Sequence, residues 1–67
     1  SHIADDVWEC IVEGRVKREM TKEECKLAWG SPKAMRQVPG YDGVREFWDY
    51  ENGHQLRFDD GLLEGIR

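Results

Sequence analysis

The sequence predicts a single α+β domain in which two N-terminal helices pack on an antiparallel meander of three or four strands (ααβββ(β)). Two observations carry this prediction. Apolar residues recur with helical spacing up to residue 29, and after residue 32 they alternate with polar residues between short turn sequences. We expect the one domain to span residues 1–67 and, at this length, to bury about 60% of the surface of its unfolded chain.

The first helix is predicted within residues 3–13. At about 100° per residue, the apolar side chains of this segment gather in one broad arc and the acidic side chains occupy the rest. Gly14 follows directly and suits the left-handed position that ends many helices. Residues 15–19 are then expected to form a basic loop.

The second helix has a specific start sequence. Thr21 is followed three residues later by Glu24, which is the spacing of a capping box. Met20 and Cys25 stand where a hydrophobic staple would place them, and this would direct Cys25 toward the first helix. Thr21 is therefore predicted to be the N-cap.

The end of the second helix is expected at residue 29, because Gly30 and Pro32 follow. One face of the helix would carry Cys25, Ala28 and Trp29, whereas Leu27 lies on another. We therefore expect this helix to be buried on more than one side.

Short strands are predicted between the turn sequences that follow. Strands at 44–50 and 54–59 are clear, a last strand covers roughly 62–66, and a weaker first strand covers 35–38. The turn sequences are Pro39-Gly40, Asp42-Gly43, Asn52-Gly53 and Asp60-Gly61.

The loop between the two clear strands decides their register. A two-residue loop would pair Trp48 with Arg57 and scatter the aromatic side chains over both faces. A three-residue loop at 51–53 pairs Trp48 with Leu56, and we prefer it because it gathers the apolar side chains. Phe47 then faces away from the core. The core side would carry Trp48, Tyr50, Leu56 and Phe58.

Cys10 and Cys25 would lie level with each other in an antiparallel helical hairpin. A disulfide across this interval of about 15 residues would stabilise the domain by about 3 kcal/mol in the chain-entropy description. The alternative is two buried free thiols that act as small hydrophobes. The residues alone leave both alternatives open.

No catalytic, cofactor or metal site is expected. The spacing of Cys10, Cys25 and His54 is not that of a structural zinc site. Cys25 as a nucleophile would need a nearby base, and His54 is expected at a strand end beside a turn. Asp59 and Asp60 adjoin a turn glycine, where aspartate is favoured for local hydrogen bonding. We therefore expect a protein that is not an enzyme and needs no cofactor.

The net charge of −4 disfavours binding to nucleic-acid backbone, because that affinity comes from cations that displace counterions. Apolar stretches are far shorter than the ~20 residues that a membrane-spanning helix needs. Trp48 and Tyr50 beside Arg45 and Arg57 could form a stacking platform, but core packing is the preferred interpretation.

Several short motifs follow one another in residues 14–66, with the motif residues Met20, Thr21, Glu24, Gly30, Pro32, Trp48, Tyr50, Phe58 and Gly61. Together with the order of elements, these motifs resemble the SmpA/OmlA family of small envelope lipoproteins, whose fold resembles the repeat unit of β-lactamase inhibitor protein. Glu19 stands where the family has a glycine, and Cys25 stands where an aliphatic residue is usual. The resemblance is therefore that of a divergent member.

The resemblance implies a periplasm-facing module that binds or stabilises other envelope proteins and is held at the outer membrane, if at all, only by a lipid anchor ahead of the folded part. It also favours the Cys10–Cys25 disulfide. Contact candidates for a partner are Tyr41, Asp42 and Phe47. The alternative that the same fold suggests is an inhibitor of a secreted hydrolase, with Tyr41 and Asp42 as the natural probe.

Overall fold

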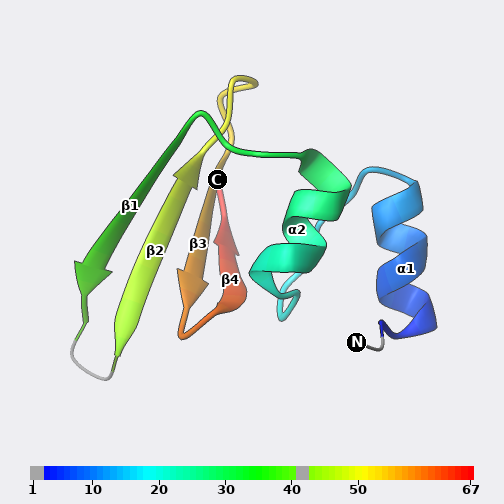
Figure 1. Ribbon diagram of the computed structural model, residues 1–67, viewed down its shortest axis with the longest axis horizontal. Helices are drawn as coiled ribbons and strands as arrows, with labels where there is room; N and C mark the ends of the chain where they lie inside the picture. Colours follow the sequence, from blue (N-terminus) through cyan, green and yellow to red (C-terminus); the bar gives the residue numbers. More distant parts are fainter. Residues whose placement is uncertain (1–2, 41–42) are drawn as a thin grey trace.

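The computed structural model describes residues 3–40 and 43–67 and confirms the predicted α+β class. Two helices, α1 (Asp5–Val12) and α2 (Lys22–Trp29), precede the strands. The strands are β1 (Ala34–Pro39), β2 (Val44–Asp49), β3 (Gln55–Asp59) and β4 (Leu62–Ile66). They form one antiparallel sheet in the order β1-β2-β3-β4, so the weaker first strand is a full member (Figure 1).

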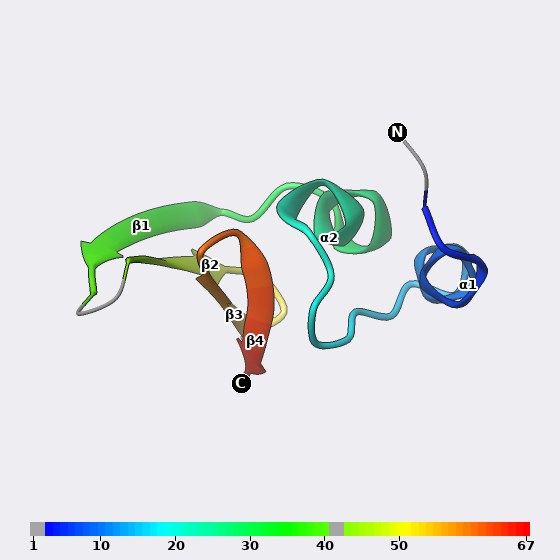
Figure 2. The same ribbon diagram turned by 90° about the horizontal axis from the view of Figure 1, so that it is seen from below.

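The two helices lie side by side but do not form the expected antiparallel hairpin. Figure 1 shows them running in the same direction, because the chain between them returns along the length of α2. Figure 2 shows α2 between the sheet and α1. The argument that placed Cys10 and Cys25 level therefore does not hold, and both are buried free thiols in the structure. Cys25 belongs to the core shared with the sheet rather than pointing to α1 alone.

Gly14 ends α1 as predicted. Its φ is 71°, in the left-handed region, and its N–H donates to the carbonyl of Ile11 at 3.1 Å. The N–H of Arg15 donates to the carbonyl of Cys10 at 2.8 Å, which completes a Schellman motif. The carbonyl of Gly14 accepts a hydrogen bond from Nε1 of Trp29 at 2.9 Å, and this bond connects the end of α1 to the end of α2.

The capping box of α2 is present. The hydroxyl of Thr21 accepts from the N–H of Glu24 at 3.2 Å, and the Glu24 carboxylate accepts from the N–H of Thr21 at 2.9 Å. Gly30, with φ of 81°, ends the helix. Both boundaries agree with the sequence-based prediction.

The expectation that α2 is buried on more than one side is wrong. The side chain of Leu27 is 57% exposed, whereas Ala28 and Trp29 pack against the core. The apolar arc of α1 is likewise only partly covered, since Trp8 and Val12 are exposed. Eight-residue helices that stand side by side cannot cover each other all round, so the outer part of each apolar arc faces solvent.

The chain immediately before α2 pairs with β4. The N–H of Glu19 donates to the carbonyl of Leu63 at 2.6 Å, and the N–H of Leu63 donates to the carbonyl of Met20 at 2.8 Å. A bridge between Thr21 and Leu62 continues the pairing. These contacts cover the outer edge of β4 at Leu62 and Leu63 and attach the helices to the sheet.

The core lies between α2 and the inner side of the sheet. The predicted register is confirmed: Trp48 stands opposite Leu56, and the N–H of Tyr50 donates to the carbonyl of His54 at 3.0 Å across a loop with Gly53 at φ 88°. The buried apolar side chains are Met20, Cys25, Trp48, Tyr50, Leu56, Phe58 and Leu63.

Replacement of Glu19 by glycine should stabilise the fold. Glu19 has φ of 75°, a left-handed conformation that costs a residue with a Cβ roughly 1–2 kcal/mol. The matched control is Glu19→Ala, which removes the same carboxylate but keeps the Cβ. We expect Glu19→Gly to exceed Glu19→Ala in free energy of unfolding by about 1 kcal/mol, measured by urea denaturation. Equal free energies of unfolding for the two variants would show that the left-handed conformation of residue 19 is not strained.

Candidate functional site

The side of the sheet that faces away from the helices carries a row of arginines around one aromatic ring. Phe47 points to this side, as predicted, because it alternates with the buried Trp48. Arg36 on β1 and Arg57 on β3 stand directly opposite Phe47 on either side. We call this surface the outer face and define it by Arg36, Arg45, Phe47, Asp49, Arg57 and Asp59.

The arginines of the outer face make only long ion pairs or a cation–π contact. The guanidinium of Arg36 lies 4.7 Å from the centroid of the Phe47 ring, a cation–π contact. Arg45 Nε is 3.4 Å from Asp59 Oδ1, and an Arg57 terminal nitrogen is 3.5 Å from Asp59 Oδ2. Arg57 Nε and Asp59 Oδ1 are both buried without a hydrogen bond among the described residues. Asp59 therefore holds the guanidinium groups of Arg45 and Arg57 only loosely.

Of the three predicted partner contacts, only Phe47 is placed by the structure. Tyr41 and Asp42 lie outside the described residues, between β1 and β2. The arginines of the outer face were not predicted as contact residues. Their alternation with Glu46 and Trp48 along β2, together with the register of the strands, could have identified them.

Glu46 is a buried carboxylate on the inner side of the sheet that sequence reasoning missed. It accepts hydrogen bonds from Lys22 Nζ at 2.7 Å, Gln37 Nε2 at 3.0 Å and Trp48 Nε1 at 2.5 Å. Burial acts to raise the pKa of Glu46, but these hydrogen bonds and the Lys22 charge outweigh it and lower the pKa to about 2. Glu46 thus joins α2, β1 and β2, which is a structural role.

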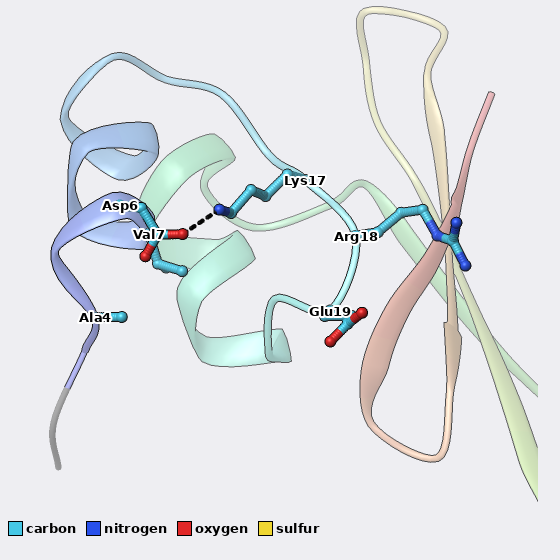
Figure 3. A pocket seen from close by; sticks show the side chains of 6 residues that line it. All are labelled: Ala4, Asp6, Val7, Lys17, Arg18 and Glu19. Carbon is cyan, nitrogen blue, oxygen red and sulfur yellow. Dashed lines mark hydrogen bonds and ion pairs between the residues drawn. The ribbon is translucent and has the colours of Figure 1, made fainter.

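An open groove of about 660 Å³ separates the start of α1 from the loop before α2 (Figure 3). The basic groups that line it are already paired: Lys17 Nζ contacts Asp6 Oδ2 at 2.5 Å, and Arg18 turns toward β4 to contact Glu64 at 2.9 Å. The remaining lining residues are Ala4, Val7 and Glu19. Both cations that line the groove, Lys17 and Arg18, are therefore already neutralised by carboxylates.

The thiol of Cys25 is not suited to nucleophilic chemistry. Burial, with a smaller effect of the Glu24 charge, raises the pKa of Cys25 to about 12, so the group is protonated at neutral pH. The contacts of the His54 ring are with other groups: Nδ1 is 3.1 Å from the carbonyl oxygen of Arg67, and the ring centroid is 5.5 Å from that of Trp29.

Residues 3–40 and 43–67 contain no group of three or more side chains that could hold a metal ion. None of the helices in this part of the chain is long and apolar enough to cross a membrane. Comparison of the chain with protein-family models, with curated proteins and with solved structures finds no match.

The buried carboxylate predicts a defined loss of stability in acid. The pKa of Glu46 is lowered from 4.5 in the unfolded chain to about 2 in the fold, so its contribution is present above pH 4.5 and is lost as the pH falls toward 2. We expect a loss of at most about 3 kcal/mol in the free energy of unfolding over this window. Denaturation of the wild type and of Glu46→Gln at pH 2–6 measures it.

The Glu46→Gln variant should be less stable at pH 6 and should depend less on pH below 4.5. Asp6, whose pKa the Lys17 hydrogen bond and charge lower, remains in that variant and leaves a residual slope. An unchanged slope in the variant would contradict the role of Glu46.

The thiol of Cys25 should be protected in the folded protein. Because it is fully buried and its pKa is raised to about 12, we expect alkylation by iodoacetamide at pH 8 only after unfolding in urea. Mass spectrometry of peptides from protein alkylated before and after unfolding, without reductant, measures this. Absence of any free thiol after unfolding would instead demonstrate the Cys10–Cys25 disulfide.

Proposed function

We propose that this chain is a non-catalytic protein-binding or scaffolding module of the cell envelope. The observation that carries the proposal is the outer face, which neither helix covers and which has Phe47 at its centre. An aromatic side chain beside arginines is the composition enriched where proteins contact each other. Its partners would be other envelope proteins rather than nucleic acid, in keeping with the net charge of −4.

The sheet edges support the same function. In the β1–β2 pair the N–H of Gly40 donates to the carbonyl of Gly43, and antiparallel pairing alternates from there. The backbone groups of Met35 and Gln37 therefore point away from β2, into solvent. β4 is already paired with residues 19–21, so β1 is the edge that a partner could extend. This edge adjoins the outer face at Arg36.

Membership of the SmpA/OmlA-like family is part of the proposal, and with it a periplasmic or outer-membrane location. Glu19 supports it most specifically. It stands where the family has a glycine, and its φ of 75° is a conformation that favours glycine. The motif residues Met20 and Thr21 act in the core and in the cap of α2. The conformation of residue 19 would therefore suit the glycine of the family motif, which supports the proposed membership.

Site-specific photo-crosslinking in cells tests the function. A photoreactive phenylalanine analogue at position 47 should capture envelope proteins, identified by mass spectrometry. The same analogue at position 15, an exposed site on the helix side, serves as the control. Recovery of cytosolic proteins alone from position 47 would refute the envelope assignment. If the captured protein is a secreted hydrolase whose activity falls on binding, the module acts as an inhibitor.

A further inference from the structure

We infer that the outer face binds a carboxylate-rich, extended segment of the partner protein, recognised by Arg36, Arg45 and Arg57. This inference rests on the proposed protein-binding function and names the chemistry of the partner. It follows from the way the chain distributes its charged pairs over the two sides of the sheet.

Four basic side chains on the helix side lie within 2.9 Å of a carboxylate: Arg15 with Glu13, Lys17 with Asp6, Arg18 with Glu64 and Lys22 with Glu46. A fifth, Lys26, lies over the Trp48 ring instead, with Nζ 5.7 Å from the ring centroid. On the outer face Arg45 and Arg57 share the single carboxylate of Asp59 at 3.4 and 3.5 Å, beyond good hydrogen-bond distance, and Arg36 lies against a ring. Within the described part of the chain, none of these three guanidinium groups is therefore held by a carboxylate as closely as the four basic groups on the helix side.

The spacing of the three arginines suits an extended peptide. Arg36 and Arg57 lie two strands apart, about 10 Å, and Arg45 lies one strand across and two residues along from each of them, about 8 Å. Carboxylates two residues apart in an extended segment are about 7 Å apart, a difference from the arginine spacing that the long, flexible arginine side chains can take up. Arginine matches a carboxylate with two parallel hydrogen bonds, and the Phe47 ring between them offers apolar contact to the partner's methylene groups.

The remaining charges of the outer face leave a net positive surface on an acidic chain. Three arginines face two carboxylates, and Asp49 already accepts a hydrogen bond from Gln55 at 2.9 Å. The two carboxylates and the single aromatic ring disfavour nucleic acid, which needs cations in excess and several stacking rings. Three arginines are also too few to hold an anionic membrane surface, for which clusters of about four to eight basic residues are typical. An acidic protein segment is the occupant that these charges favour.

Fluorescence anisotropy with the full chain tests the inference. The probe is a labelled peptide in which glutamate alternates with valine, and the control peptide has glutamine in place of glutamate. We expect saturable, salt-sensitive binding of the glutamate peptide only. Arg36→Gln and Arg57→Gln should each weaken it about tenfold, whereas Arg15→Gln should leave it unchanged. Asp59→Asn should tighten it, because it releases Arg45 and Arg57; thermal unfolding checks that each variant is folded.

Three results would overturn the inference: no saturable binding of the glutamate peptide, equal binding of the glutamine peptide, or equal losses from Arg15→Gln and Arg36→Gln. Tighter binding of a single-stranded oligonucleotide of equal charge, or of vesicles containing anionic lipid, would assign the face to that ligand instead. Capture of envelope proteins at position 47 alongside any of these results would leave the proposed function intact. Peptide binding without envelope capture would refute only the cellular role.

Discussion

The rest of the fold depends on the antiparallel pairing of Glu19 and Met20 with Leu63. It is the hydrogen-bonded contact through which the chain before α2 joins the sheet, and it carries Met20 into the core, where this side chain is completely buried. The pairing forces Glu19 into a left-handed conformation, and the two hydrogen bonds to Leu63 keep it there. Because α2 begins two residues later, the position of Lys22 over Glu46 follows from the same pairing.

Local signals in the sequence were sufficient for the parts of the fold that are determined locally. Thr21 and Glu24 define a helix start by their own hydrogen bonds, and Gly53 decides a strand register through the length of one loop. The exposure of Leu27 and the parallel course of the helices were not predicted, since both depend on where the returning segment places α1. No short-range pattern encodes that placement.

The candidate site was predictable in part for the same reason. Phe47 was placed correctly by alternation alone. Glu46 shares the alternation of Trp48 and was predictable in principle, but a buried carboxylate is improbable until its partners are known, and Lys22 and Gln37 come from other elements. Consecutive residues of β2 thus have opposite roles: Glu46 holds the inner side together, whereas Arg45 and Phe47 face outward.

The pairing of residues 19–21 with β4 also limits how the protein can assemble with itself. An open sheet with two free edges can add copies without end, which is the geometry of fibrils. Here residues 19–21 cover one edge at Leu62 and Leu63, and at the other edge Pro39 has no N–H to offer a neighbouring strand. Two copies that met edge to edge through β1 would leave a third copy only the partly covered edges of β4. Sheet growth beyond a pair would therefore be disfavoured, so the β1 edge can serve recognition with little tendency to polymerise.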